Sequence, residues 1–263
     1  MPSPPGLERH LKGRLADGGK LFVPYLTCGI PSPDGFLEAF GVLAETADAI
    51  EVGIPFSDPV MDGPVIQASS MRAIEAGMTL DRCFSLISDA TAGADIPVVV
   101  MTYFNPIHRR GIHDFTTWLW ESGVTGLIVP DLPYEEGEEL NDALEDAGVA
   151  HIQMVAPTTS PERAAMLASA SRGFVYAVSR LGVTGERESL ERAASRVVAL
   201  VRPHTDIPVL LGIGITTGEQ ARQACEIADG VIVGSAIVAR VLEGDTAGAG
   251  ALAKEIRGAI GEQ

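Results

Sequence analysis

Three carboxylates lie in and just after one apolar run, residues 49–64 (AIEVGIPFSDPVMDGP). Glu51 alternates with apolar neighbours, as in a buried strand, while Asp58 and Asp62 follow in a loop rich in proline and glycine. A buried carboxylate without a cationic partner costs several kcal/mol or takes up a proton. The segments at 21–27 and 97–103 offer no Lys or Arg. Glu51 is therefore expected to do chemistry, whereas Asp62, in an Asp-Gly pair, also fits an ordinary turn.

A second cluster consists of glycines near the end of the chain. Residues 211–215 (LGIGI) and 233–236 (VGSA) each end a predicted strand, and the second opens a short helix. Glycines at such places let backbone N–H groups approach an oxyanion, and a helix N-terminus favours negative charge. Two tight turns are the alternative. Their joint occurrence after the last two strands favours phosphate binding, the usual arrangement in a (β/α) barrel.

Other chemistries fit less well. Thr217 stands where a dinucleotide fingerprint needs its third glycine, and residues 182–185 (GVTG) lack the lysine of a P-loop, although that loop could close over a ligand. The three lysines, Lys12, Lys20 and Lys254, lie near the ends of the chain, which argues against a Schiff-base lysine on a strand. The five histidines show no metal-ligand spacing. Carboxylate acid–base chemistry on a phosphorylated substrate remains.

Eight short β-branched runs alternate with amphipathic helical patterns, such as 33–45, which Ser32 and Pro33 begin, and a second that opens at Ser160-Pro161. Eight βα units predict a (β/α)8 TIM barrel of parallel strands, with a short extra helix after strand 8. A doubly wound open sheet is the alternative. No linker divides the chain, so residues 1–263 are expected to form a single domain. The predicted strands are 21–27, 49–53, 97–103, 126–129, 152–155, 174–178, 208–211 and 230–233.

The composition indicates which classes of partner the protein can bind and in which compartment it is expected. The 263 residues carry a net charge of −16, which argues against nucleic acid or an anionic membrane surface as a partner. Cys28, Cys83 and Cys225 lie far apart with no CxxC, so neither a zinc ribbon nor a disulfide framework is expected. The N-terminal segment lacks an apolar core, and the longest apolar run is too short to span a bilayer. We expect a cytoplasmic protein that acts on a small molecule.

These residues resemble the tryptophan synthase alpha subunit family. The resemblance runs from about Phe22 to Glu243 through FVPYLTCGIPS, IEVGIPFSDPVMDGPVIQ, VVVMTYFNPI, GLIVPDLP, VAPTTSPERA, GFVYAVSRLGVTG, GIGI and ADGVIVGSAIV. It implies a lyase that cleaves indole-3-glycerol phosphate to indole and glyceraldehyde 3-phosphate by a retro-aldol reaction, in the last steps of tryptophan biosynthesis. Glu51 matches the family's general acid and base, and Asp62 matches its second catalytic carboxylate. Asp62 would bind the indole N–H.

The resemblance also implies roles for further residues. Phe22 and Tyr103 would form the apolar indole side, and Tyr176 and Thr184 would lie near the substrate and the closing loop. Asp58 and Asp131 would face a beta subunit. In the family, alpha and beta chains form an alpha2-beta2 heterotetramer, and indole passes through a tunnel to pyridoxal phosphate on beta, with no cofactor on alpha. The residues that match the phosphate cradle are Gly185, Gly214, Gly234 and Ser235.

Three positions depart from the family pattern. Met61 stands where Ala is usual, Ile213 where an aromatic residue is common, and Ile30 where an acid is frequent. The departures put loop closure and coupling to a beta subunit in question. A stand-alone indole-releasing lyase, a catalytically silent barrel that regulates a partner enzyme, and another phosphate-barrel isomerase are the alternative functions.

Overall fold

The barrel is a single sheet of parallel strands that closes on itself. The structure, a computed structural model, describes residues 6–178 and 187–261, with the side chains of 187–191 excepted. The sheet order is β5-β4-β3-β2-β1-β9-β8-β7-β6, and the two end strands follow each other in the chain with only Ile152 between them. The strands are β1 Leu21–Thr27, β2 Ile50–Gly53, β3 Val98–Met101, β4 Gly126–Ile128, β5 Ala150–His151, β6 Gln153–Val155, β7 Val175–Val178, β8 Val209–Gly212 and β9 Gly230–Val233.

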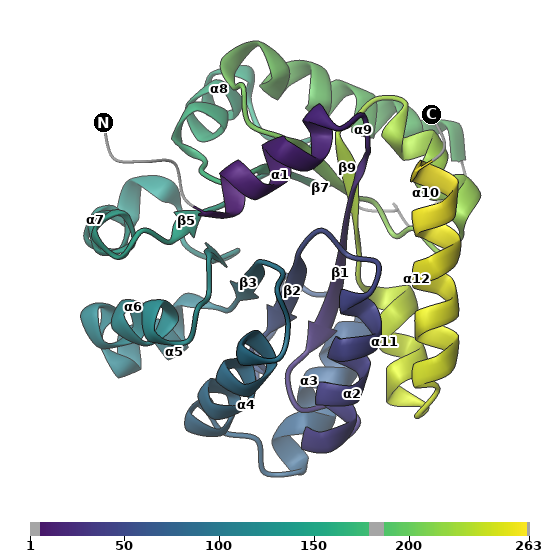
Figure 1. Cartoon of the computed structure of the whole chain (residues 1–263). Coiled ribbons are helices and arrows are strands. Elements are labelled where there is room, and N and C mark those ends of the chain that lie inside the picture. The colour runs from purple at the N-terminus through teal and green to yellow at the C-terminus, as the bar shows by residue number, and fades with distance from the viewer. Residues whose placement is uncertain (1–5, 179–186, 262–263) are drawn as a thin grey trace.

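Helices surround this sheet on the outside (Figure 1). The α-helices are α1 Gly6–Ala16, α2 Pro33–Ala44, α3 Pro64–Glu75, α4 Leu80–Ala92, α5 Phe104–Arg110, α6 Ile112–Glu121, α7 Glu138–Ala147, α8 Pro161–Ala170, α9 Arg187–Val201, α10 Gly218–Cys225, α11 Ser235–Leu242 and α12 Thr246–Gly261. Two 3-10 turns, Tyr134–Glu136 and Arg202–His204, complete the described elements. The short α11 is the extra helix expected after the last strand. None of the helices within the described residues is long and apolar enough to span a membrane.

The predicted elements agree with the structure except at their ends. Ser32 caps α2 by accepting a hydrogen bond from Gly35 N, and Ser160 does the same for α8 with Arg163 N. The strand expected at 152–155 begins two residues earlier and is split at Ile152 into β5 and β6. Sequence pattern defines element ends least well, because terminal turns depend on tertiary contacts. The closed parallel sheet excludes the doubly wound alternative.

The inside of the barrel is a separate apolar core that α1 closes at one end. Val23 of β1, Val99 of β3 and Leu210 of β8 belong to this inner cluster, together with Leu7 and Leu11 of α1. Figure 1 shows α1 lying across the barrel. Because α1 covers the end at which the strands begin, the opposite end, where they finish, is the one available for a ligand.

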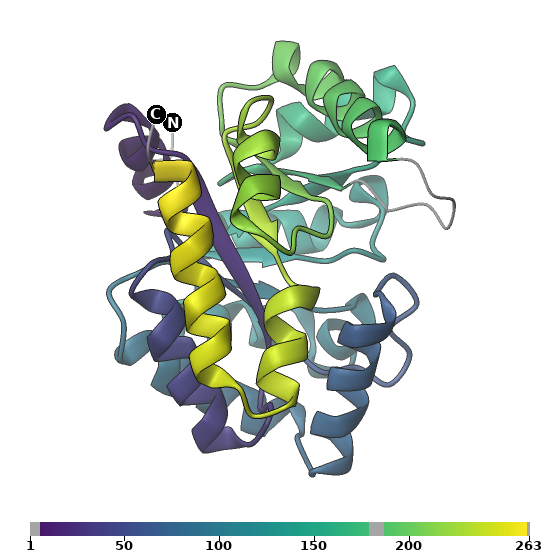
Figure 2. The same ribbon diagram turned by 90° about the vertical axis from the view of Figure 1, so that its right-hand side faces the viewer.

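The outer core lies between strands and helices. Alternate residues of β1 face this layer, among them Phe22 and Leu26. Figure 2 shows α12 along the outside of β1 with α11 beside it. The C-terminal helix therefore covers the face of β1 that points away from the barrel interior.

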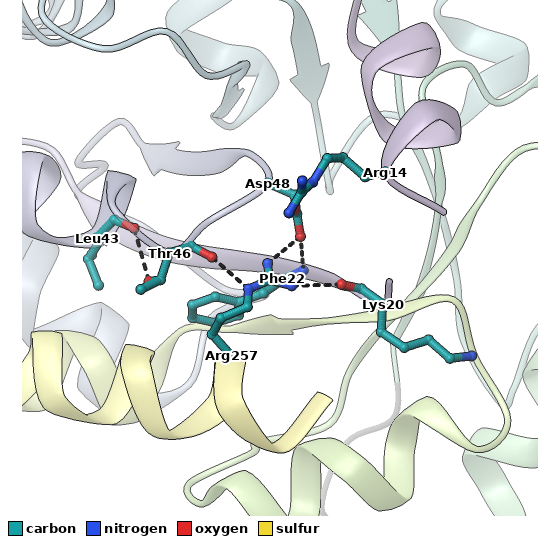
Figure 3. Close-up of polar contacts among 7 residues, drawn as sticks. All are labelled: Arg14, Lys20, Phe22, Leu43, Thr46, Asp48 and Arg257. Carbon is teal, nitrogen blue, oxygen red and sulfur yellow. Dashed lines mark hydrogen bonds and ion pairs between the residues drawn. The ribbon is translucent and has the colours of Figure 1, made fainter. Parts of the chain in front are cut away.

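A buried ion pair fixes α12 to the start of the barrel. Asp48, which is 1% exposed, pairs with Arg14 Nε at 2.8 Å and with Arg257 of α12, and it accepts a hydrogen bond from Phe22 N at 2.8 Å (Figure 3). Arg257 also donates to the carbonyl groups of Thr46 and Lys20. Every polar atom of this carboxylate is thus satisfied by groups from three separate segments, at the end of the barrel opposite the opening.

Candidate active site

Glu51 projects into the barrel near the open end. Ala49, two residues before it, belongs to the inner cluster, and Glu51 shares its face of β2. The side chain is 1% exposed, and its Oε2 has no hydrogen-bond partner within the described residues. Burial, and secondly the negative charge of Asp62, raise the pKa of Glu51 to about 8. Glu51 is therefore mostly protonated at pH 7 and can deliver a proton.

Asp62 lies above Glu51 on the loop between β2 and α3, and Tyr103 holds it. The Tyr103 hydroxyl donates to Asp62 Oδ2 at 3.2 Å and accepts from Met61 N at 3.0 Å. Phe56 stacks on the Tyr103 ring with centroids 5.0 Å apart. Burial raises the pKa of Asp62 to about 6, while the hydrogen bond from Tyr103 opposes that rise. Asp62 is thus mostly ionised at pH 7.

Two tyrosines enter the interior near Glu51, Tyr25 from the neighbouring strand β1 and Tyr176 from β7. Tyr25 of β1 lies over Gly53 of β2, where an added Cβ would come within 1.9 Å of the tyrosine oxygen. Tyr176 of β7 lies in the same way over Gly212 of β8, where an added Cβ would come within 2.5 Å of its ring. Glycine at each of these positions is therefore needed for a ring to lie flat against the neighbouring strand. Burial raises the pKa of both hydroxyls, so both tyrosines stay neutral.

The different environments of Glu51 and Asp62 give Glu51 the higher pKa. Glu51, with a pKa of about 8, is an acid at neutral pH, and Asp62, with a pKa of about 6, is an anion. Such a pair can donate a proton from one group while the other stabilises positive charge. The aromatic rings of Tyr25, Tyr103 and Tyr176 give a planar apolar substrate surfaces to pack against.

The loops after β8 and β9 lie side by side, because their strands are neighbours in the sheet. Gly214 has a φ of +75°, a conformation that favours glycine. Gly234 is the N-cap of α11, without a side-chain capping bond, and Ser235 is exposed at the first turn. The N-terminal N–H groups of α11 can therefore receive an anion at the same end of the barrel as Glu51.

The arrangement matches known proteins over nearly the whole chain. A family model described as tryptophan synthase alpha chain matches residues 11–258. The chain belongs to this family. A tryptophan synthase alpha chain from Synechococcus elongatus is 42% identical over 250 residues, covering 94% of each chain, and one from Streptomyces avermitilis is 42% identical over 262 residues, covering 96% of this chain and 95% of the relative.

Solved structures of the family share the fold. A structure of tryptophan synthase from Mycobacterium tuberculosis superposes with a TM-score of 0.92 at 37% identity, covering 99% of this chain and 100% of that chain. Tryptophan synthase subunit alpha from Legionella pneumophila gives a TM-score of 0.89 at 31% identity, covering 98% and 99%. Membership of the family confirms the sequence resemblance. It agrees with a lyase of tryptophan biosynthesis that cleaves indole-3-glycerol phosphate.

Phe22 does not reach the site, contrary to the expectation for an indole-side residue. Its ring is fully buried in the outer core, and the Arg257 guanidinium lies 5.9 Å from the ring centroid. The reason is the alternation of a strand: Leu21 and Val23 face the interior, so the residue between them faces out. Tyr25, three residues later, lies on the inner face, where its hydroxyl is against Gly53 of β2.

Sequence reasoning missed Tyr25 because every residue of β1 is buried, which hides any contrast between the two faces. One feature of the sequence does point to Tyr25. Tyr25 and Thr27, two residues apart, are the polar-tipped side chains of an otherwise apolar strand, and a period of two puts them on one face. The pairing of Tyr25 with Glu51 in the β1–β2 register then brings them together.

The remaining expected residues are spread around the opening. Tyr103 contacts Asp62 through its hydroxyl, and Tyr176 packs against the inner cluster. Asp58 and Asp131 are exposed on the loops after β2 and β4, and Asp131 Oδ1 also accepts a hydrogen bond from Phe104 N at 2.8 Å. Thr184 and Gly185 lie outside the described residues.

Of the departures from the family pattern, Met61 is 54% exposed on the loop that carries Asp62, and Ile30 is fully buried before a cis proline. Ile213 is half-buried next to Gly214. Within residues 6–178 and 187–261, no cluster of His, Cys, Asp or Glu could hold a metal ion.

Proposed function

We propose that this chain cleaves indole-3-glycerol phosphate to indole and glyceraldehyde 3-phosphate, with Glu51 and Asp62 as the catalytic pair. The observation that carries the proposal is the Glu51 carboxyl, buried at the open end of the barrel beside a second carboxyl of lower pKa, with no partner for Oε2 among the described residues. Family membership supports the same reaction. The pair fits a reaction that must deliver one proton and recover another.

The reaction breaks the bond between indole C3 and the adjoining glycerol carbon. Glu51, protonated at neutral pH, gives its proton to C3, and the ring takes on positive charge centred on the indole nitrogen. The bonding pair of the broken C–C bond then returns to the ring. The hydroxyl on the glycerol carbon becomes the aldehyde carbonyl and releases its proton to Glu51, which restores the starting state. No net proton is consumed.

Asp62 supports the charged intermediate. Its ionised carboxylate accepts a hydrogen bond from the indole N–H and stabilises the positive charge that develops there. Tyr103 fixes the direction of this carboxylate through the hydrogen bond at 3.2 Å. Tyr103, Tyr176 and Tyr25 pack against the indole ring, in place of the expected Phe22. The family resemblance assigns Thr184 to substrate binding as well.

The phosphate group is assigned to the loops after β8 and β9. Gly214, Gly234 and Ser235 supply backbone N–H groups and the N-terminal dipole of α11, and the family resemblance adds Gly185. Binding of the remote phosphate fixes the indole ring relative to Glu51. It therefore contributes to the rate through positioning.

The proposed partner is a tryptophan synthase beta subunit in an alpha2-beta2 complex, with pyridoxal phosphate on beta and no cofactor on this chain. The exposed Asp58 and Asp131, on loops at the open end, support a partner that covers the site. The proposed location is the cytoplasm, which the three free and buried cysteines support.

Indole release from indole-3-glycerol phosphate, measured with the isolated chain and with a beta subunit added, tests the function. Large activation by beta supports an alpha subunit that works in a complex. Equal turnover with and without beta points to a stand-alone lyase. No indole under either condition, with the chain folded, overturns the proposed function and leaves a silent barrel or another phosphate-barrel isomerase.

A further inference from the structure

Tyr25 is the residue of β1 that lies beside Glu51. The two residues are register partners in the parallel pair β1–β2, so their side chains leave the sheet on the same face at the same height. The Tyr25 ring extends toward the open end over Gly53, where an added Cβ would meet its hydroxyl oxygen at 1.9 Å. The hydroxyl therefore lies within the site, at the level of β2 just beyond Glu51.

The Tyr25 hydroxyl also has two buried hydroxyl side chains near it, those of Thr27 and Ser69. Thr27 Oγ1 makes a long 3.5 Å contact with the tyrosine oxygen, and the same Oγ1 lies 2.6 Å from Ser69 Oγ of α3. Ser69 Oγ also bonds Ile66 O at 2.7 Å. Thr27 and Ser69 are fully buried. The 3.5 Å contact with Thr27 is too long to hold the tyrosine hydrogen, so that hydrogen stays free to turn toward a stronger acceptor.

Among the residues that the structure describes, Glu51 Oε2 has no hydrogen-bond partner that would stabilise the ionised carboxylate. Within residues 6–178 and 187–261, the groups with charge or a titratable hydroxyl that face it are Asp62 from the loop after β2, Tyr25 from β1 and Tyr176 from β7, with Tyr103 directed at Asp62. The strands β3, β8 and β9 carry only apolar residues and glycine. Asp62 opposes ionisation of Glu51, so within the described residues a neutral O–H donor is what remains to stabilise the carboxylate.

We propose that Tyr25 is a positioning residue for Glu51, whose hydroxyl donates a hydrogen bond to the Glu51 carboxylate when Glu51 has given up its proton. The inference rests on the proposed function, since it concerns the step after Glu51 protonates the indole ring. A hydrogen bond to an ionised group in a buried site is stronger than one between neutral groups. Tyr25 thereby lowers the free energy of the state in which Glu51 is charged, and Thr27, bonded to Ser69, packs beside the hydroxyl.

The test is Tyr25→Phe, which keeps the ring and removes the hydroxyl. Loss of a hydrogen bond to an ionised group is expected to lower kcat for indole release about 10-fold, with KM changed by less than about twofold because the ring remains. Since the lost bond favours the ionised form, the pKa of Glu51 rises, and the alkaline limb of the kcat/KM profile moves about one pH unit upward. Thr27→Val is expected to shift the limb in the same direction by a smaller amount.

Tyr134→Phe is the matched control, because Tyr134 lies in a 3-10 turn outside the barrel interior; its kcat and pH profile are expected to equal those of the wild type. Thermal unfolding of each variant verifies the fold. A Tyr25→Phe protein with wild-type kcat and pH profile overturns the inference. A wild-type protein that releases no indole would instead overturn the proposed function. If the wild type is active and Glu51→Gln is inactive, the proposed function holds, and the result for Tyr25→Phe then tests this inference alone.

Discussion

The Tyr103 hydroxyl donates to Asp62 Oδ2 at 3.2 Å while it accepts from Met61 N at 3.0 Å. One side chain at the end of β3 therefore determines both the path of the loop after β2 and the direction of its carboxylate. The same bond favours ionised Asp62 against the burial that raises its pKa to about 6. The direction of the Asp62 carboxylate thus depends on this hydroxyl, and its pKa depends first on burial and secondly on the same hydrogen bond.

Tyr103→Phe is expected to raise the pKa of Asp62, because it removes a donor to the ionised form. The acid limb of kcat/KM for indole release should move to higher pH, with a loss of about 10-fold at pH 6 and less at pH 8. A pH profile from 5 to 9 measures this, with Tyr134→Phe as the hydroxyl control. An acid limb at the wild-type position would show that the hydroxyl does not set the pKa of Asp62.

The wild-type profile of kcat/KM should be bell-shaped. Activity falls below about 6, where Asp62 takes up a proton, and above about 8, where free Glu51 loses its proton. Asp62→Asn removes the group responsible for the acid limb, so it should flatten that limb and lower kcat by about 100-fold or more, while a phosphate ligand such as glyceraldehyde 3-phosphate still binds. Lost binding with normal turnover would contradict this division of roles.

Glu51→Gln should lower kcat at least about 100-fold, because the amide cannot deliver a proton. It should also stabilise the fold in a pH-dependent way. The pKa of Glu51 is raised in the folded state, so the folded protein holds a proton that the unfolded chain loses between about 4.5 and about 8, and the wild type loses stability as pH rises through that window.

The gain in unfolding free energy for Glu51→Gln should therefore be small near pH 5 and reach about 4 kcal/mol near pH 8. Urea unfolding at both values measures it. Glu75→Gln, at the exposed end of α3, is the control and should show no such pH dependence. Wild-type turnover of Glu51→Gln would contradict the catalytic role of Glu51. A Glu51→Gln protein less stable at pH 8 than the wild type would contradict a buried proton on Glu51.

The alternation of strands and helices was enough to predict the barrel, because each βα unit is encoded locally by its hydrophobic period and its caps. Glu51 could be singled out for a related reason: a carboxylate on an apolar strand stands out in the sequence alone. Asp62 could not be distinguished from a turn residue by local pattern. Its environment comes from Tyr103, 41 residues away in the chain, and that contact exists only once β2 and β3 are paired.

The sequence also could not show which face of a fully buried strand points into the barrel. Phe22 and Tyr25 are both apolar enough for either side of β1, so composition does not say which ring enters the interior. The tertiary structure decides it through Arg257, which occupies the outer face beside Phe22, and Gly53, which leaves room for Tyr25 on the inner face. Both of these partners lie on other elements.

Gly214→Ala should weaken phosphate binding. Gly214 has a φ of +75°, which an L side chain adopts at a cost of about 1 kcal/mol or more, so the loop after β8 should shift. We expect KM for indole-3-glycerol phosphate to rise about 10-fold with a smaller change in kcat. Gly244→Ala, with a similar φ of +78° at the far end of α11, is the matched control for strain alone. Equal effects of the two substitutions on KM would contradict the phosphate assignment.

Asp48→Ala should destabilise the fold without changing the chemistry. Asp48 is 1% exposed, and its removal leaves Arg257 of α12, which is 22% exposed, without its carboxylate and Phe22 N without an acceptor. Breaking a buried pair by removing one partner costs about 3 to 5 kcal/mol. Because Asp48 lies at the closed end of the barrel, kcat per folded molecule should stay within about twofold of the wild type.

Asp206→Ala provides the control for this loss of charge. Asp206 pairs with Lys12 at 3.1 Å, but its side chain is 91% exposed, so its removal should cost less than about 1 kcal/mol. Urea unfolding gives the two free energies, and indole release at a temperature where both variants are folded gives kcat. A stable Asp48→Ala protein with low kcat would show that this ion pair acts on the site at the opposite end of the barrel, contrary to the structural role assigned to it.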